Sequence, residues 1–311
     1  MTILVTGGAG FIGSHLVEHL LERGERVRVL DNFSTGKREN LAGRQGALEI
    51  LEGDLCQSGT IVRAVQGVEL IYHLAALVSV PRSLQDPQGC FEVNVRGTVG
   101  LLEAARQAGV AKVVLASSTA VYGNPERFPT PETAPLLPRS PYALSKQVNE
   151  QYARLYTQAL RLPVVALRFY NVYGPRQRPD SDYAAAIPLF LERVRRGEPL
   201  TIYGDGSQSR DFIFVRDVVQ ACRMAAESHA AGEAYNICTG RETSILDLVE
   251  MVQELSRPGA AKPEVRFERA RPGDVYRSLG DPARATADFG FQAATTLLDG
   301  LVDTLRWMDK P

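Results

Sequence analysis

The chain is poor in cysteine and lysine and carries almost no net charge. Its cysteines form no C-x-x-C pair and have no histidine at metal-ligand spacing, so we predict reduced core thiols and no metal site; the four are Cys56, Cys90, Cys222 and Cys238. A formal net charge of -1 at pH 7 argues against binding nucleic acid or an anionic membrane through bulk charge. Any anionic ligand must therefore be held by a local group of residues.

Long apolar runs are also missing. No stretch reaches the roughly 20 apolar residues of a membrane-spanning helix, and the chain opens on the strand-like Thr2–Val5 rather than on a basic leader. We therefore expect a soluble cytoplasmic protein with neither a membrane nor a nucleic-acid partner. With 311 residues, of which 44% are hydrophobic, the chain can bury one large core or two unequal ones.

A glycine-rich turn stands near the start of the chain. The apolar run Ile3–Val5 is typical of a buried parallel strand, and it leads through residues 6–13 into an amphipathic helix predicted over about residues 14–23. Three glycines in the turn permit a sharp bend, close approach of backbone N–H groups to a pyrophosphate and tight packing of helix on strand; they are Gly7, Gly10 and Gly13. This pattern favours a dinucleotide-binding turn.

The next strand adds a carboxylate that selects the dinucleotide. Residues 27–30 are predicted to form that strand, and Asp31 follows 18 residues after Gly13. A carboxylate here can accept both ribose hydroxyls of an adenosine and would repel a 2′-phosphate. NAD is therefore favoured over NADP, while a structural turn with a solvent-facing Asp31 is the plainer alternative.

Strands and helices alternate over the first half of the chain and predict an α/β fold. Further strands are expected at 48–51, 70–76, 112–116 and 162–168, with helices at 89–108 and 142–160. Such alternation indicates a doubly wound parallel sheet. From residue 183 onward the elements shorten and mix, with helices expected near 184–195, 217–227, 244–255 and 296–308, and strands near 200–203, 212–215, 234–237 and 264–267. We predict a domain over 1–170, joined by returning segments near 211–238, and a smaller α+β lobe over 171–311.

Polar residues follow several of the predicted strands. Asp54 is placed where an adenine amino group could donate to it, and the small pair Ala75-Ala76 would let a dinucleotide lie flat. Hydroxyls at residues 117–119 end another strand, at the crevice where such sheets bind ligands. His73 alone reads as a packed core residue.

One helix start carries a tyrosine and a lysine that can do chemistry together. Ser140 is a good N-cap and Pro141 suits the first helical position, so Tyr142 falls in the first turn and Lys146 on the same face. The ammonium and the helix dipole should both favour the phenolate, lowering a pKa that is ordinarily about 10. Only five of the 35 basic residues are lysines, which reduces the chance of coincidence. The alternative is a surface pair on an ordinary helix.

Taken in order, these motifs resemble the extended short-chain dehydrogenase/reductase family over essentially the whole chain. The resemblance rests on residues 7–13, 31–32, 53–55, 117–119 and the pair Tyr142 and Lys146. Within that family the chain is most similar to nucleotide-sugar epimerases of the UDP-glucose/UDP-N-acetylglucosamine 4-epimerase type. Three later stretches support this, at residues 168–174, 204–212 and 271–274.

The resemblance implies roles for named residues. Tyr142 is the base, Lys146 binds the nicotinamide ribose and lowers the Tyr142 pKa, and Ser118 bonds the reacting sugar oxygen. It implies that NAD is held by Gly7, Gly10, Phe11, Ile12, Gly13, Asp31, Asn32, Ser34, Gly36, Asp54, Leu55, Leu74, Ala75, Ala76, Asn94, Ser117, Tyr142, Lys146 and Tyr170. It places the UDP-sugar on Ser79, Ser118, Thr119, Asn171, Ala185, Ala186, Ile202, Tyr203, Arg210, Arg271, Asp274 and Ser278.

Within that substrate set, the resemblance assigns the UDP pyrophosphate to Asn171, Arg210 and Arg271, and the uridine ribose to Asp274. A guanidinium offers phosphate oxygens a planar fork of donors. Ser278 falls where a bulky residue restricts the pocket to UDP-glucose and UDP-galactose, and residues 78–83 look like the N-acetylhexosamine-active members. The small serine predicts that UDP-GlcNAc and UDP-GalNAc are also accepted.

The implied reaction is C4 epimerisation through a bound 4-keto sugar, in a homodimer formed by the helices at 89–108 and 142–160. Nucleotide-sugar 4,6-dehydratases and decarboxylases of the same family are the nearest alternatives. Dehydratases carry Thr-Asp-Glu where this chain reads Ser118-Thr119-Ala120, and the decarboxylases' glutamate is absent too. A catalytically silent NAD-binding sensor or scaffold is a further alternative, since a fold does not dictate a function.

Overall fold

Seven parallel strands form the main sheet, in the order β11-β6-β5-β4-β1-β2-β3. The computed structural model describes residues 1–179, 185–256, 259, 263–270 and 275–309. The strands of the sheet are β1 (Thr2–Thr6), β2 (Arg26–Asp31), β3 (Leu48–Glu52), β4 (Leu70–His73), β5 (Lys112–Ser118), β6 (Val164–Phe169) and β11 (Ala234–Ile237). The predicted doubly wound parallel sheet is confirmed.

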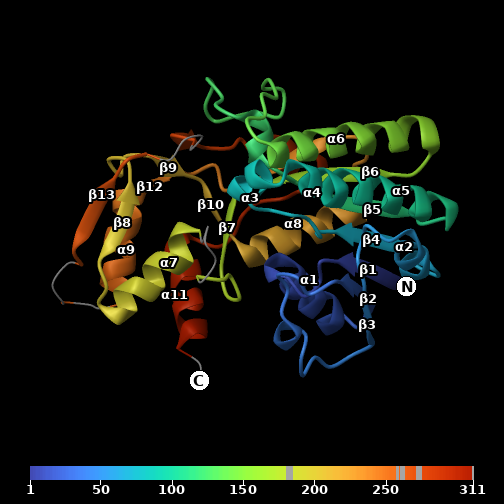
Figure 1. Ribbon diagram of the computed structural model, residues 1–311, viewed down its shortest axis with the longest axis horizontal. Helices are drawn as coiled ribbons and strands as arrows, with labels where there is room; N and C mark the ends of the chain where they lie inside the picture. Colours follow the sequence, from blue (N-terminus) through green and yellow to red (C-terminus); the bar gives the residue numbers. More distant parts are fainter. Residues whose placement is uncertain (180–184, 257–258, 260–262, 271–274, 310–311) are drawn as a thin grey trace.

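Helices cover both faces of this sheet (Figure 1). One core lies beneath α1 (Phe11–Glu22) and α8 (Val215–Glu227). The other lies beneath α2 (Ser58–Val65), α5 (Gly97–Gln107) and α6 (Pro141–Leu160). Burial on both faces explains why the central strands are continuously apolar rather than alternating, as in β6, where all six residues are buried.

The second half builds a smaller lobe with its own core. Its helices are α7 (Ala186–Arg196), α9 (Ile245–Ser256) and α11 (Leu297–Met308). Its short strands pair as β8 (Leu200–Tyr203) with β13 (Val265–Glu268), β7 (Asn171–Tyr173) with β10 (Phe212–Phe214), and β9 (Ser209–Arg210) with both β12 (Thr243–Ser244) and β14 (Arg277–Ser278). The expected helices and strands of this half are present, and β11 returns to the main sheet beside β6. The domain boundary at residue 170 stays a prediction.

Several short elements escaped the sequence analysis, namely α2, α3 (Val80–Gln85), α10 (Ala283–Phe289) and β7. The predicted helix at 89–108 is present as α4 (Pro87–Phe91) followed by a π-helical turn at Glu92–Arg96 and then α5. Such π turns are rare and often accompany functional sites. Among the described helices, none has the length and apolarity that crossing a membrane requires.

The core of the lobe meets the sheet core beneath α1 and α8 at the start of α1. Phe11 and Ile12 pack against the lobe core, while the rest of α1 packs on the sheet. Further along α1, His15 Nε2 lies 2.8 Å from the Pro175 carbonyl oxygen, and Glu18 accepts a hydrogen bond from Arg176. The first helix of the chain is therefore shared between both parts.

Candidate active site

The predicted site residues converge because parallel strands end at one edge of the sheet. The strand order reverses between β1 and β4, where the chain leaves to opposite sides and a crevice opens beyond the carboxyl ends. Gly7 and Leu74 directly follow β1 and β4, while Asp31 and Ser118 are the last residues of β2 and β5. The fold thus brings the glycine-rich turn and the Ser118 hydroxyl to the same edge.

The glycine-rich turn fits a pyrophosphate. Gly7 has φ +71°, a conformation that side chains disfavour, and a Cβ on Gly13 would lie 2.1 Å from the Gly7 carbonyl oxygen. Gly10 is the N-cap of α1 and provides no side-chain hydrogen bond to the first turn. The N–H groups at this helix start are therefore left for an anion, which the positive end of the helix dipole also favours.

Two carboxylates lie at the strand ends where the sequence predicts the adenosine to bind. Asp31 is buried and accepts hydrogen bonds from the Ala9 and Phe33 N–H groups at 2.9 and 2.8 Å, which fix the carboxylate while leaving lone pairs for ribose hydroxyls. Asp54 accepts the Cys56 N–H at 2.7 Å and the Asn32 amide at 2.9 Å. These bonds, led by that of Cys56, lower the pKa of Asp54 and keep it ionised.

The loop after β4 is held by the π turn. Asn94 accepts the Leu77 N–H at 2.8 Å and donates to the Leu77 carbonyl oxygen at 3.1 Å and the Ser145 hydroxyl at 3.0 Å. Its side chain is buried, so it positions the loop that carries Leu74, Ala75 and Ala76. His73 lies between Thr6 and Thr98, and burial lowers its pKa to about 3. The prediction of a packed core histidine is confirmed.

The helix start at Ser140 forms as predicted and delivers the tyrosine–lysine pair. The Ser140 hydroxyl accepts the Ala143 N–H at 3.1 Å, and Pro141 occupies the first turn of α6. Tyr142 is 9% exposed and Lys146 5% exposed, so the surface-pair alternative is wrong. The Tyr142 hydroxyl lies close enough to the Ser118 side chain for Ser118 to lower its pKa. Lys146 Nζ donates to the Ala116 carbonyl oxygen at 2.8 Å and lies 5.8 Å from the centre of the Tyr142 ring.

The predicted lowering of the Tyr142 pKa is wrong for the chain by itself. Burial raises the pKa of Tyr142, and only the hydrogen bond from Ser118 opposes that rise. Burial also lowers the pKa of Lys146 to about 8. The ammonium bonds the Ala116 carbonyl and faces the ring of Tyr142, so it does little for the phenolate oxygen. A further positive charge is needed to favour the phenolate, and the nicotinamide ring of oxidised NAD carries one.

The substrate side is organised by a buried aspartate that the sequence analysis did not single out. Asp211 is fully buried and accepts hydrogen bonds from Thr239, Gly240 and Gly280. Its carbonyl oxygen accepts the Asn171 amide at 3.1 Å. Because Arg210 precedes it, Asp211 fixes two predicted phosphate-binding residues at once. Its position directly after an arginine in a glycine-rich stretch was the available signal.

A family model described as the NAD dependent epimerase/dehydratase family matches residues 3–238. The chain belongs to this family. Its members include the UDP-glucose 4-epimerase of Mycolicibacterium smegmatis, which is 41% identical over 311 residues, 99% of this chain and 98% of that protein. Nucleotide-sugar dehydratases and decarboxylases are also among the matching relatives. The chain is thus an enzyme of the epimerase/dehydratase family.

Solved structures of epimerases have the same fold. The UDP-glucose 4-epimerase of Thermotoga maritima with UDP-glucose has a TM-score of 0.93 and 37% identity, covering 99% of this chain and 98% of that one. The Thermus thermophilus UDP-glucose 4-epimerase in complex with NAD has a TM-score of 0.90 and 41% identity, covering 99% of both chains. The resemblance to extended short-chain dehydrogenase/reductases is confirmed, and NAD is the cofactor.

The remaining predicted residues of this epimerase/dehydratase chain differ in how their side chains lie. The buried side chains of Leu55, Ile202 and Tyr170 belong to the cores, so they shape the site from beneath. Ser117 donates its hydroxyl to Glu150. The Ser79 hydroxyl caps α3 by accepting the Arg82 N–H. Half-buried or exposed side chains are found at Ser34, Thr119, Ala185, Ala186 and Tyr203.

The rest of the predicted set is fixed by backbone packing or lies beyond what the structure describes. A Cβ on Gly36 would meet the Ala9 backbone at 2.9 Å. Ser278 of β14 pairs with Arg210 of β9, which places it next to a predicted phosphate ligand. Arg271 and Asp274 fall outside the described residues, and their predicted roles stay predictions.

Proposed function

We propose that this enzyme interconverts C4 epimers of UDP-hexoses by transient oxidation of the sugar at C4. The buried Tyr142, beside the Ser118 side chain at the end of β5, is the observation that carries the proposal. Bound NAD accepts the hydride from C4 and returns it. Tyr142 takes the proton of the 4-hydroxyl during oxidation and gives it back during reduction, while Ser118 orients the reacting oxygen. Arg210 and Asn171 anchor the UDP while the hexose turns.

The segment after Ser118 favours epimerisation over dehydration. Elimination of water across C5–C6 needs an additional acid and base beside the tyrosine. Here Thr119 and Ala120 occupy those positions, at the start of a short 3-10 helix whose Ala120 N–H bonds back to Ser118. Neither residue has a carboxylate. The proposal therefore favours an isomerase among the family's reactions.

The product of the purified enzyme tests this function. UDP-glucose, UDP-galactose, UDP-GlcNAc and UDP-GalNAc are each incubated with the enzyme, first without added NAD, and the products are separated and identified. C4 epimers are expected from both members of each pair. A 4-keto-6-deoxy product with no epimer would show a dehydratase instead. UDP-glucuronate is incubated as a fifth substrate, and its decarboxylation would show a decarboxylase.

We predict that Ser278→Tyr removes activity on the acetylated sugars selectively. Ser278 lies beside Arg210 across β14 and β9, so a larger side chain there would narrow the space near the UDP anchor. Turnover of UDP-GlcNAc should fall by about 100-fold, the steric cost of an overfilled pocket, while UDP-glucose turnover stays within about threefold. The UDP-glucose reaction serves as the internal control. An unchanged ratio of the two activities would refute the gate.

We propose that the enzyme is a homodimer formed through the helical segment at 89–108 and α6. Leu144 and Leu155 are 52% and 50% exposed on α6, and 11 residues apart they fall on one face of that helix; Phe91 of α4, a helix that packs against α6, is 53% exposed. Exposed apolar groups of this kind mark interfaces. Light scattering should give a dimer, and Leu144→Glu/Leu155→Glu a monomer. The control is Leu298→Glu, at the equally exposed Leu298 in the lobe. A monomeric wild type would contradict the proposal.

A further inference from the structure

Three consecutive residues of β5 each face a residue from a different turn of α6. Ser118 lies beside Tyr142, the Ala116 carbonyl accepts a hydrogen bond from Lys146 Nζ at 2.8 Å, and the Ser117 hydroxyl donates to Glu150. Positions 142, 146 and 150 are four apart, so their side chains share the helix face that meets the sheet. Glu150 is therefore the third member of the row that holds the catalytic pair, although the proposed reaction gives it no role.

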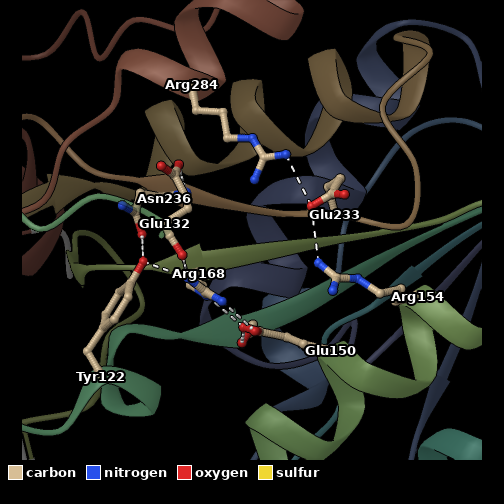
Figure 2. A network of polar contacts seen from close by, with 9 residues as sticks. Tyr122, Glu132, Glu150, Arg154, Arg168, Glu233, Asn236 and Arg284 are labelled. Atoms are coloured by element: carbon tan, nitrogen blue, oxygen red, sulfur yellow. Dashed lines mark hydrogen bonds and ion pairs between the residues drawn. The ribbon is translucent and has the colours of Figure 1, made fainter. Parts of the chain in front are cut away.

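Glu150 is buried together with an arginine. Its two carboxylate oxygens accept Arg168 Nε at 2.9 Å and Nη2 at 2.7 Å, and the two side chains are 8% and 5% exposed (Figure 2). Arg168 pairs with Ser117 across β5 and β6, so this ion pair sits directly behind the strand end that carries Ser118. A two-pronged buried pair of this kind has fixed geometry, and removing one charge leaves the other without compensation.

The far side of Arg168 is fixed as well. Its Nη1 donates to the Tyr122 hydroxyl at 2.7 Å, and that hydroxyl donates to the Asn236 side chain at 2.7 Å (Figure 2). Tyr122 belongs to the 3-10 helix that starts right after Ser118, and Asn236 belongs to β11. The guanidinium thus connects α6, the segment after Ser118 and the edge strand of the sheet. Because Arg168 is fixed on both sides, the Glu150 carboxylate that it binds is also held in one orientation.

We propose that Glu150 is a positioning residue for Tyr142 and Lys146. It holds α6 against the strand end that carries Ser118, and it neutralises Arg168 so that no net positive charge stands beside Lys146. The inference rests on the proposed function, since it takes Tyr142 as the base. It adds the requirement that the positive charge of Arg168 be neutralised by Glu150, which the pair Tyr142 and Lys146 alone does not imply.

Other titratable groups surround this row. Cys90 of α4 and His73 of β4 lie near Lys146, and because burial raises the Cys90 pKa and lowers the His73 pKa, both stay uncharged. On the outer side, Glu233 lies 3.5 Å from Arg154 of α6 and 3.1 Å from Arg284 of α10. These three residues and Glu132, whose pKa is raised by burial, line a cavity of about 280 Å³. Glu150 and Arg168 lie along the wall of the same cavity. Glu150 remains the charged residue that lies one turn from Lys146 on the same helix face.

The test replaces Glu150 by its uncharged isostere. Glu150→Gln keeps the shape and one acceptor but leaves Arg168 uncompensated. The added positive charge favours the phenolate of Tyr142 and disfavours the ammonium of Lys146, so both limbs of the pH–rate profile should move to lower pH. At the roughly 12 Å that separates two turns of a helix, the shift for Tyr142 should be about one pH unit. We expect kcat to fall about tenfold with KM for the UDP-sugar unchanged, because Glu150 does not touch the UDP anchor.

A double variant separates charge from scaffold. Glu150→Gln/Arg168→Gln removes both charges, so its pH profile should return to that of the wild type even where thermal stability is lower. A second measurement needs no turnover: the phenolate absorbance of Tyr142 is titrated as the difference between each protein and its Tyr142→Phe counterpart. That titration should move to lower pH in Glu150→Gln and return in the double variant.

The outcomes distinguish this inference from the proposed function. If Glu150→Gln loses stability and rate while the pH profile and the phenolate titration stay in place, Glu150 is only part of the scaffold and the inference is overturned. If Glu150→Gln does not fold, a phenolate titration of the double variant displaced from that of the wild type overturns it equally. If the wild type gives no epimer, the proposed function fails, and the phenolate titration still decides the role of Glu150.

Discussion

Tyr142→Phe is expected to lower turnover by about 100- to 10,000-fold, the range that a positioned general base contributes. The phenyl ring keeps the packing of a side chain that is only 9% exposed, but no group remains to take the proton of the sugar 4-hydroxyl. The variant also removes the hydroxyl that lies beside Ser118. UDP binding, measured by calorimetry, should change little, because the predicted UDP ligands lie in other elements.

The matched control is Tyr152→Phe, which removes a hydroxyl from the same helix at a half-buried position away from the site. Its turnover should stay within about twofold of the wild type, as for most substitutions away from special features. Equal activity of Tyr142→Phe and the wild type would refute the mechanism. A large loss in both variants would point to damage to α6 rather than to lost proton transfer.

Gly13→Ala is expected to abolish tight NAD binding and to destabilise the protein. The new Cβ would lie 2.1 Å from the Gly7 carbonyl oxygen and 2.9 Å from Gly8 Cα, both backbone atoms that no side-chain rotation can move aside. The turn has to open, at a cost of about 1–3 kcal/mol in unfolding free energy. Opening the turn also moves its N–H groups away from the pyrophosphate. If NAD binding loses a similar free energy, the affinity for NAD falls about 10- to 100-fold.

Gly59→Ala controls for the loss of a glycine. Gly59 lies in α2 with nothing within 4 Å of an added Cβ, so the alanine should stabilise the helix by up to about 1 kcal/mol. Thermal unfolding and NAD titration of both variants make the comparison. If Gly13→Ala binds NAD as tightly as the wild type, the close contact between Gly13 and Gly7 is not what shapes the cofactor site.

The sequence allowed the fold and much of the site to be predicted where one local rule decided the structure. Ser140-Pro141 fixed the start of α6, and positions 142 and 146 then had to share a face. Asp31 followed from the end of an apolar strand. Short elements such as α3 and α10 were missed because a few residues give no periodicity to read, and their conformation depends on packing against distant segments.

Interactions between distant residues account for the rest. The pKa of Tyr142 was predicted in the wrong direction. The spacing of Tyr142 and Lys146 along a helix can be predicted from the sequence, but the burial that raises the pKa depends on distant segments that pack around Tyr142 in the folded chain. Asp211 is held by residues 28 and 69 positions away, which no local pattern contains. Glu150 did have a signal, four residues after Lys146, but its partner Arg168 becomes visible only when β5 and β6 pair.

The sharing of α1 makes the two parts of this enzyme inseparable. Phe11 and Ile12 belong to the predicted cofactor-binding turn and also pack against the core of the lobe, and Glu18 and His15 bind the segment at residues 175–176. A chain cut near residue 170 would expose an apolar helix start on one fragment and leave an open core on the other. Grafting the lobe onto a different dinucleotide-binding domain would therefore require transplanting α1 as well. In this architecture the lobe that we propose to select the substrate cannot be exchanged without the helix that follows the glycine-rich turn.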